Sequence, residues 1–159
     1  MLTTNFKDKK SISNNDIMME LIKNQLPNID EEKRLYLHDI KRIAKNLMSS
    51  IFDKEVCSLW NGYITNLNKA NKGTYINFYF RKKKVALHRL LYANYIGPID
   101  NTEYIKYSCQ HKGYCCNVNC LKKFKYNSVK SNKKIIHNMP NKKNYTNEEI
   151  KNKLCIEFN

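Results

Sequence analysis

Four cysteines constrain this chain more than any other feature of its sequence. Cys109, Cys115 and Cys120 follow one another at intervals of six and five residues, and Cys57 lies far upstream. Zinc favours four tetrahedral ligands that are commonly thiolates, and loops of this length can bring two of them onto one ion. A small loop-rich region gains on the order of 10 kcal/mol of folding free energy from such an ion. The spacing therefore predicts a structural zinc (Zn²⁺) site formed by these four residues.

Two further cysteines and one histidine are interpreted differently. Cys116 directly follows Cys115, so its side chain is expected to point elsewhere and to pack in the core. Cys155, near the C-terminus, is interpreted as a small buried apolar residue. His111 lies inside the cysteine loop, where it either replaces one thiolate as a ligand or is exposed.

The length of 159 residues and the apolar content of 42% suit one domain with an extension. The sequence contains no apolar run long enough to span a membrane and no secretory signal pattern. We therefore expect an intracellular protein, located in the nucleus, in the cytoplasm or in a viral factory. Thiols stay reduced inside a cell, so six cysteines there favour metal binding over disulfides.

The positive charge is concentrated in the middle of the chain. Residues 56–147 hold seventeen Lys and Arg against only Asp100 and Glu103, whereas the two ends are close to neutral. A basic face that only contacts solvent is normally interleaved with acids, so this distribution favours a polyanionic partner. A codon bias explains 25 Lys against 4 Arg, but it does not explain where the acids lie. Nucleic acid is the expected partner, with RNA or an acidic protein as alternatives to DNA.

The sequence pattern divides the chain into four segments. Residues 1–14 are polar and predicted to be disordered. Residues 15–52 are predicted to form a helical extension, in which a short helix ends before Pro27 and a longer one begins at Asp30. Residues 56–136 form the basic module, and residues 137–159 a linker and a short helix. The longer helix carries an apolar stripe for the core or for a partner chain, formed by Leu35, Leu37, Ile40, Ile43, Ala44, Leu47 and Ile51.

Within the basic module the pattern predicts a hairpin followed by a helix. Residues 74–80 are rich in β-branched and aromatic side chains and are predicted to form a strand, with a turn over 81–84 and a return strand over 85–87. A helix is predicted over 88–96, closed by Gly97 and Pro98. A short strand over 104–107 leads into the cysteine loop, and a second helix is predicted in part of 121–134.

Several short motifs follow one another in a fixed order across residues 56–134. They are Cys57-Ser-Leu-Trp60, the hairpin, His88-Arg89-x-x-Tyr92, Gly97-Pro98-Ile99, Cys109 and Cys115-Cys-Asn117-Val-Asn-Cys120-Leu121. This succession resembles the zinc-containing HNH/His-Me finger endonucleases, which include intron-encoded homing endonucleases. The ordered series is far more specific than any one of its motifs.

The resemblance implies an α+β fold, in which a zinc-stapled ββα-metal (His-Me finger) module carries a helical N-terminal extension. In that family the zinc ligands are an upstream Cys, two loop Cys and a His that precedes a Leu. Here Cys120 stands at the position of that His, and a thiolate is an equally good zinc ligand. The resemblance therefore implies the same four ligands as the cysteine spacing.

The resemblance also implies a nuclease site, and here the chain departs from the family. The general base of the family is a His two residues before the first loop Cys, and that position holds Tyr107. Imidazole, with a pKa near ~6.5, can take a proton from water at neutral pH, whereas a phenol near ~10 is poorly suited. The Asn that holds the catalytic divalent ion in the family is best matched by Asn132 and next by Asn127. We interpret His88 as a structural hydrogen-bonding residue.

Three functions follow from these features. The favoured one is a zinc-binding, DNA-binding protein of HNH type whose catalytic site is degenerate. The first alternative is an active Mg²⁺-dependent endonuclease in which His111, or an activated Tyr107, acts as the base. The second alternative is a zinc-structured interaction protein, whose segment 30–51 recruits a partner or forms a dimer while the basic module contacts polyanions nonspecifically.

Double-stranded DNA is the expected partner, and the hairpin is expected to contact it. A two-stranded ribbon fits the major groove, and lysines supply phosphate contacts. Alternation along the strand places half of the tyrosines in the core. The predicted contact residues are Tyr75, Asn77, Tyr79, Arg81, Lys82, Lys83 and Lys84 on the hairpin, with Lys122 and Lys123 on a second basic surface.

Overall fold

The computed structural model describes residues 12–127. The predicted linker and C-terminal helix at 137–159, Asn132, Cys155 and most of the predicted disordered segment 1–14 lie outside these residues. The described part combines helices with two small antiparallel sheets, which confirms the mixed α and β character of the predicted fold class. The elements are α1 (Asn14–Asn24), α2 (Leu37–Lys45), β1 (Asn77–Phe80), β2 (Lys83–Ala86), α3 (Leu87–Tyr95), β3 (Glu103–Tyr107), the 3₁₀ turn η1 (Val118–Cys120) and β4 (Leu121–Lys125).

Helix α1 begins where the sequence supplies a capping residue. Ser13 is extended, and its hydroxyl accepts a hydrogen bond from the backbone amide of Asp16 at 3.1 Å. The carboxylate of Asp16 also lies in the positively polarised first turn. The helix buries Ile17 and Leu21, which lie four residues apart on one face.

Helix α2 is shorter than the predicted helix that begins at Asp30. The backbone at Tyr36 is extended, and the carboxylate of Asp39 accepts a hydrogen bond from the Tyr36 amide at 3.0 Å, so this pair begins the helix at Leu37. The helix ends at Lys45 because Leu47 forms a backbone bridge to Trp60 instead. Of the predicted apolar stripe, Leu37 is wrong, since it is 53% exposed. The buried members are Leu35, Ile40, Ile43, Ala44, Leu47 and Ile51.

The first hairpin has a tighter turn than the sequence predicts. Phe80 pairs with Lys83, so only Arg81 and Lys82 form the turn, and both have positive φ, at 46° and 64°. Two residues with positive φ fit the right-handed twist of a hairpin, although Asn and Gly usually occupy them. Alternation along β1 buries Phe78 and Phe80. It exposes Asn77 and Tyr79 on the outer face.

The second hairpin corrects the helix predicted within residues 121–134. Leu121–Lys125 forms β4, which pairs antiparallel with β3 from Tyr107↔Leu121 to Glu103↔Lys125. A strand forms here because the cysteine loop returns the chain beside β3, whose backbone groups are then satisfied by pairing. The part of the predicted helix from residue 128 lies outside the described residues.

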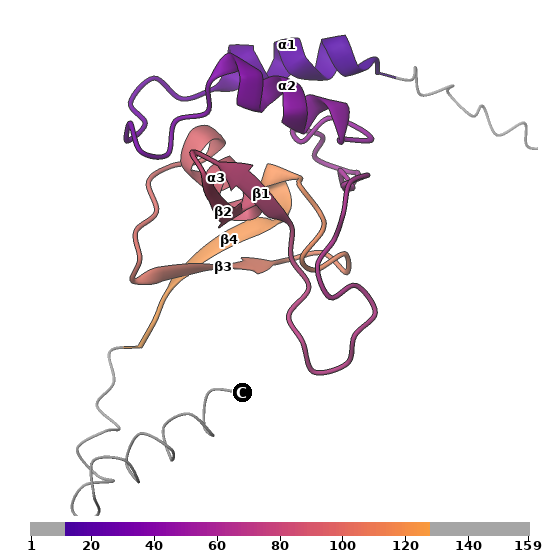
Figure 1. The fold of residues 1–159 in the computed structure, drawn as a ribbon, viewed down its shortest axis with the longest axis vertical. Coiled ribbons are helices and arrows are strands. Elements are labelled where there is room, and N and C mark those ends of the chain that lie inside the picture. Colours follow the sequence, from indigo (N-terminus) through magenta and orange to yellow (C-terminus); the bar gives the residue numbers. More distant parts are fainter. Residues whose placement is uncertain (1–11, 128–159) are drawn as a thin grey trace, which may run out of the picture. The chain divides into compact units, whose positions relative to one another are not determined.

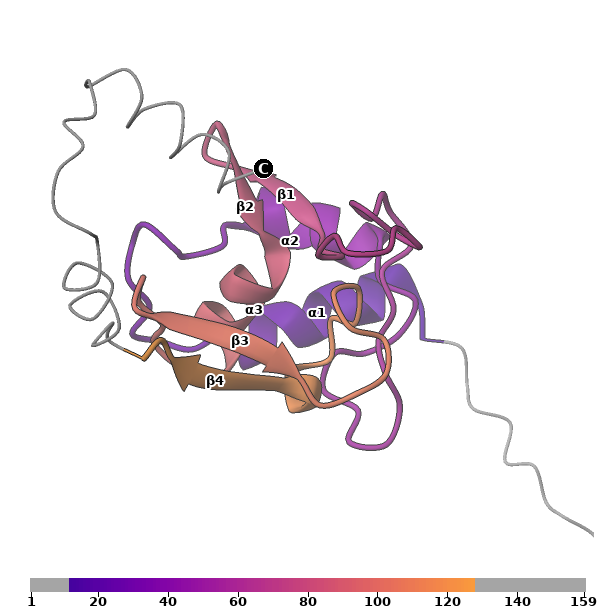
Figure 2. The same ribbon diagram turned by 90° about the horizontal axis from the view of Figure 1, so that it is seen from below.

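The described residues share one core. Figure 1 shows α1 and α2 side by side on one side of α3, with the hairpin of β3 and β4 on the other side, and Figure 2 shows α3 between the two hairpins. Side chains from α1, α2, β1, α3 and β4 belong to the same buried cluster. The helical segment at 15–52 therefore packs against the basic module.

Asn94 of α3 joins this helical segment to the module, because three of its four side-chain hydrogen bonds reach residues 25–35. Its side chain is fully buried. Its Oδ1 accepts from the amide of Leu35 at 3.0 Å and from Nε2 of Gln25 at 2.9 Å. Its Nδ2 donates to the carbonyl oxygens of Lys33 and Leu90, both at 2.8 Å. One amide side chain thus satisfies polar groups that the core would otherwise leave unpaired.

We expect Asn94→Ala to lower the free energy of unfolding by roughly 3 kcal/mol, because buried donors and acceptors lose their partners. Urea denaturation followed by circular dichroism measures this change. Asn15→Ala, at an exposed position of α1, is the matched control and is expected to cost less than about 0.5 kcal/mol. Equal effects of the two substitutions would contradict the role of Asn94.

Candidate metal centre

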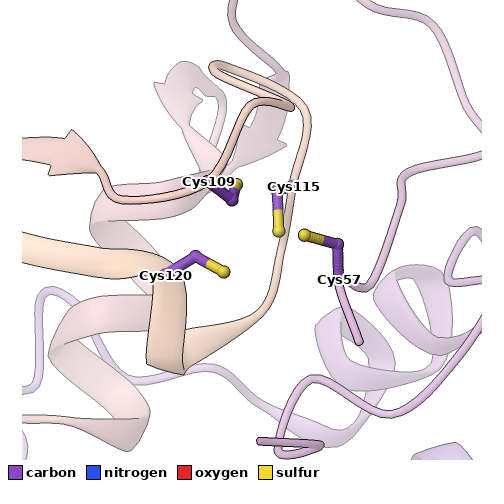
Figure 3. A group of neighbouring side chains, drawn as sticks. All are labelled: Cys57, Cys109, Cys115 and Cys120. Atoms are coloured by element: carbon purple, nitrogen blue, oxygen red, sulfur yellow. The ribbon is translucent and has the colours of Figure 1, made fainter. Parts of the chain in front are cut away.

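Four cysteine side chains converge at one point of the structure. The sulfur atoms of Cys57, Cys109, Cys115 and Cys120 all lie within 4.8 Å of one another, and Figure 3 shows the side chains directed toward a common centre. Cys115 is buried, and the other three are half-buried. This cysteine cluster can hold a metal ion, and its members are the four residues that the sequence predicts.

Three of the four sulfurs come from one hairpin. Cys109 follows the end of β3 by two residues, Cys120 ends η1 immediately before β4, and Cys115 lies in the loop between them. The amide of Ser108 donates to the carbonyl of Cys120 at 2.9 Å, which continues the pairing of β3 with β4 into the loop. The strand pairing therefore holds Cys109 beside Cys120.

The fourth sulfur reaches the cluster through a short antiparallel contact. Residues 57–60 run beside residues 114–116, and an isolated bridge joins Leu59 to Cys115. Hydrogen bonds link Trp60 N to Tyr114 O at 3.2 Å and Cys116 N to Ser58 O at 2.7 Å. Backbone pairing thus brings the segment that carries Cys57 beside the segment that carries Cys115.

The side chain of Asn117 fastens the segment before Cys57 to the cysteine loop. It is buried, and its Nδ2 donates to the carbonyl oxygens of Asp53 at 2.6 Å and Val56 at 2.7 Å. Its Oδ1 accepts from the amide of Asn119 at 2.8 Å. Asn117 belongs to the sequence motif of residues 115–121, but its spacing predicts no role for it. An Asn immediately before η1, whose side chain accepts from the amide two residues further on, is a signal for such a local turn.

Gly113 allows the loop between Cys109 and Cys115 to pack closely against the rest of the molecule. Its φ is +92°, and a Cβ built there would lie 2.0 Å from the carbonyl oxygen of Thr74. Only glycine accommodates both the conformation and the close approach. The loop between Cys109 and Cys115 therefore packs directly on the segment that leads into β1.

Backbone amides point at two of the sulfurs. The amide of Asn117 donates to Sγ of Cys115 at 3.4 Å, and the amide of His111 interacts in the same way with Cys109. Burial acts to raise the pKa of Cys109, but the His111 amide and the neighbouring thiols lower it overall. Burial raises the pKa of Cys115, and it raises that of Cys120 to about 11. A bound cation would favour the thiolate form of all four groups.

The neighbouring cysteine and histidine lie outside the cluster. Cys116 is buried in the hydrophobic core, which confirms that it is a packing residue. The ring of His111 packs edge-on against Tyr114, with centroids 5.7 Å apart. Among the described residues, the group that can hold a metal does not include His111.

Tyr107 lies at the end of β3 against the side chain of His88. The two ring centroids are 5.6 Å apart. Burial raises the pKa of Tyr107, and the nearby cysteine thiols act in the same direction. Burial also lowers the pKa of His88 to about 4, with a further contribution from the charge of Arg89. Within residues 12–127, Nδ1 of His88 has no hydrogen-bond partner, so the structural hydrogen bond predicted for this residue is not formed by that atom.

The predicted DNA-contact residues have different environments. Asn77, Tyr79, Lys82, Lys83, Lys84 and Lys122 are exposed, and Tyr75 is half-buried. Arg81 turns back toward the helical segment, where it lies 3.9 Å from Glu31 and over the ring of Tyr36. Lys123 donates to the carbonyl of Pro98 at 2.9 Å and lies 3.4 Å from Glu103.

Comparison with known proteins identifies one relative and no family. No protein-family model matches the chain, and no solved structure matches it. The chain is 50% identical over 149 residues to an uncharacterized protein of Acanthamoeba polyphaga mimivirus. The alignment covers 93% of this chain but 42% of the viral protein, so the chain spans less than half the length of that relative. Within residues 12–127, no helix combines the length and apolar character needed to cross a membrane.

We expect Cys120→Ser to lose most of the bound metal, because one of the four sulfur ligands is removed. The free energy of unfolding should fall by at least about 3 kcal/mol, since metal binding contributes to folding. Elemental analysis and urea denaturation measure the two effects. Cys116→Ala, the adjacent control, should keep the metal and cost about 1 kcal/mol. Full metal retention by Cys120→Ser would exclude the four-cysteine site.

We expect Asn117→Ala to weaken metal binding about 10- to 100-fold, because the segment that carries Cys57 loses its anchor. Competition with a chromogenic chelator measures the metal affinity. Asn119 is the matched control, since its exposed side chain makes longer hydrogen bonds, of 3.3 Å to Phe52 and 3.2 Å to Asp53. Asn119→Ala should change the affinity by less than about threefold, which is smaller than the cost of a lost outer-shell partner. A larger loss in Asn119→Ala than in Asn117→Ala would overturn this assignment.

Proposed function

We propose that this chain is a zinc-stapled DNA-binding protein of HNH/His-Me finger type whose catalytic site is degenerate. The observation that carries this proposal is the joint placement of four cysteine sulfurs within 4.8 Å of one another and of Tyr107 on the strand that leads into them. The cluster supports a structural metal. The residue at the end of β3 supports the loss of cleavage chemistry.

Zinc fits the donor set of the cluster. Four thiolates at about 2.3 Å from a tetrahedral zinc ion are separated by about 3.8 Å. Sulfurs that already lie within 4.8 Å of one another reach this geometry through small side-chain rotations. Four protein ligands fill the coordination shell, which is typical of structural rather than catalytic zinc. The ion would hold the loop of residues 109–120 against the segment that carries Cys57.

The order of elements supports the resemblance to the HNH type. A hairpin, then a helix, then a strand that ends at the base position precede the cysteine loop, and β4 follows it. The antiparallel pair β3 and β4 corresponds to the two strands of a ββα-metal module. The chain segment that would form the helix of this ββα-metal module lies outside the described residues.

The tyrosine at position 107 is the main reason to propose that the protein does not cleave DNA. Hydrolysis of a phosphodiester requires a group that takes a proton from water near neutral pH, and a phenol does so poorly. The packing of Tyr107 against His88 gives the ring a structural role in place of a chemical one. The alternative is a Mg²⁺-dependent nuclease with His111 as the base. Asn132, the candidate to hold that Mg²⁺ ion, lies outside the described residues.

The cationic groups available to DNA are lysines. All four arginines hydrogen-bond within the protein: Arg34 to Pro27, Arg42 to Asp39 and Tyr79, Arg81 to Arg34, and Arg89 to Glu103 and Asp100. Lys82, Lys83 and Lys84 remain exposed at the end of the first hairpin. Lysines bind phosphate as point charges, while bidentate guanine contacts mostly use arginine. The proposal therefore predicts strongly salt-dependent binding with little reading of guanine.

We expect Lys83→Ala/Lys84→Ala to weaken duplex DNA binding and to reduce the slope of log affinity against log salt by about two. Fluorescence anisotropy of a labelled duplex at several salt concentrations measures both quantities. Lys23→Ala/Lys45→Ala, on exposed positions of α1 and α2, removes the same charge and should leave the slope nearly unchanged. Equal changes in the two double variants would indicate nonspecific charge attraction and contradict binding through the hairpin.

Cleavage is tested with supercoiled plasmid and the zinc-loaded protein, with and without added Mg²⁺. We expect a salt-sensitive mobility shift without nicking. Nicking that requires Mg²⁺ and disappears in His111→Ala would show that the protein is a nuclease with a relocated base, and the degenerate assignment would then be wrong. A Tyr107→Phe variant that still nicks would exclude an activated phenol.

A further inference from the structure

The outward face of the second hairpin carries three aromatic rings and two lysines. Because side chains alternate along a strand, Glu103, Ile105 and Tyr107 of β3 lie on the opposite face from Tyr104 and Lys106. The strand register places Phe124 opposite Tyr104 and Lys122 opposite Lys106. Tyr126 follows β4, and its amide extends the pairing by donating to Thr102 O at 2.9 Å. We call Tyr104, Lys106, Lys122, Phe124 and Tyr126 the aromatic platform.

The three rings form one continuous group. Tyr104 lies between the other two, with centroid distances of 5.9 Å to Phe124 and 4.7 Å to Tyr126. The interplanar angles are 27° and 37°, so the rings are closer to stacked than to edge-on. Phe124 is 45% exposed and Tyr126 is 62% exposed. Large apolar rings are therefore exposed to solvent next to each other. Single exposed apolar residues are common on protein surfaces, whereas a contiguous group of them marks an interaction site.

The charge on this face is entirely positive. Lys106 and Lys122 are exposed, and none of the five platform residues is acidic. The acid of this hairpin, Glu103, is buried on the other face and contacts Lys123 at 3.4 Å. The ammonium group of Lys106 lies over two rings, 5.7 Å from the centroid of Tyr104 and 5.1 Å from that of Phe124. A partner that combines flat apolar groups with negative charge would match this surface.

The geometry points to a binding site for single-stranded nucleic acid on the aromatic platform. Unpaired bases stack on exposed rings whatever their sequence, and lysines beside the rings neutralise the phosphates that link them. An exposed contact between a lysine and a ring is weaker than the stacking of a base on that ring. The ammonium group of Lys106 can therefore leave the rings and contact a phosphate while bases stack in its place. Duplex DNA does not offer unstacked bases to such a surface. The platform would therefore bind loops, ends or separated strands.

This site is distinct from the duplex contact proposed above. The platform lies on the second hairpin, whereas the proposed duplex contact uses Lys82, Lys83 and Lys84 of the first. DNA and RNA strands share the bases and phosphates that the platform would recognise. The test therefore includes both, because a preference between them depends on the sugar. Failure of duplex binding would leave the platform assignment unaffected.

The test compares platform variants of the full-length, zinc-loaded protein for binding to labelled oligonucleotides. We expect Phe124→Ala/Tyr126→Ala to weaken binding of an unpaired dT or U oligomer by about 10-fold or more, since two stacking surfaces are lost. Duplex affinity should stay within about twofold of the wild type, because stacking on unpaired bases does not contribute to it. Phe124→Trp should retain or strengthen binding to the single strand, because the ring is kept. Lys106→Ala should reduce the salt slope by about 0.7.

Tyr63→Ala is the matched control, because Tyr63 is 80% exposed and belongs to no ring pair among the described residues. It should leave single-strand binding unchanged. Circular dichroism and metal content check that each variant is folded. Loss of single-strand affinity in Tyr63→Ala equal to that in the platform variant would overturn the proposal. So would a change of oligomeric state in Phe124→Ala/Tyr126→Ala without a change in nucleic-acid binding, since the platform would then contact a second copy of the chain.

Discussion

The short antiparallel contact between residues 57–60 and 114–116 is the constraint on which the rest of the module depends. It places Cys57 beside Cys115, and it closes a loop of the chain that contains the first hairpin, α3 and β3. Closing such a long loop costs conformational entropy, and a few backbone hydrogen bonds offset little of that cost. Metal binding at the junction would offset it far more strongly. Asn117 and Gly113 support the same junction, one through hydrogen bonds to Asp53 and Val56, the other through close contact with Thr74.

The helical segment and the basic module depend on each other through α3. Asn94 receives and donates four hydrogen bonds there, and three of its partners belong to residues 25–35. Two acids of the helical segment hold arginines that reach between this segment and the first hairpin, since Arg42 of α2 donates to Tyr79 O and Arg81 of the hairpin turn lies near Glu31. Asp39 holds Arg42 at 2.8 Å, and Glu31 lies 3.9 Å from Arg81. The arginines are thereby committed to the fold, while many lysines remain in solvent. The overall charge of +15 belongs mainly to lysines because the chain holds 25 Lys and 4 Arg. Within residues 12–127, Lys82, Lys83 and Lys84 are among the exposed ones.

The two hairpins present different surfaces, and the proposed function gives each surface its own kind of nucleic acid. The first ends in a tight turn with exposed lysines, which suits the regular phosphates of a duplex. The second presents aromatic rings, which suit unpaired bases. Three of the four cysteines lie at one end of the second hairpin, and Gly113 in the same loop packs against Thr74, which leads into the first. A metal at this point would keep each surface in place without taking part in binding. Neither surface uses the side chain at position 107, so both are compatible with the proposed loss of the catalytic base.

The sequence by itself determined the four cysteines that meet, the presence of the first helix, the first hairpin, α3 and the strand before the cysteine loop. The helices, the hairpin and the strand depend on local spacing and alternation, which residues close in the chain specify. The sequence shows Cys57 as a ligand only through its residue type, because the contact that brings it to the other three joins segments remote in sequence. The tertiary structure decided where α2 begins and ends, because Leu47 pairs with Trp60 from a later segment. It also decided that Leu121–Lys125 is a strand, since β3 supplies its partner. The roles of Asn94, Asn117 and Arg81 were equally hidden, because each bonds to residues remote in sequence. Such partners are chosen by packing, and no local pattern encodes them.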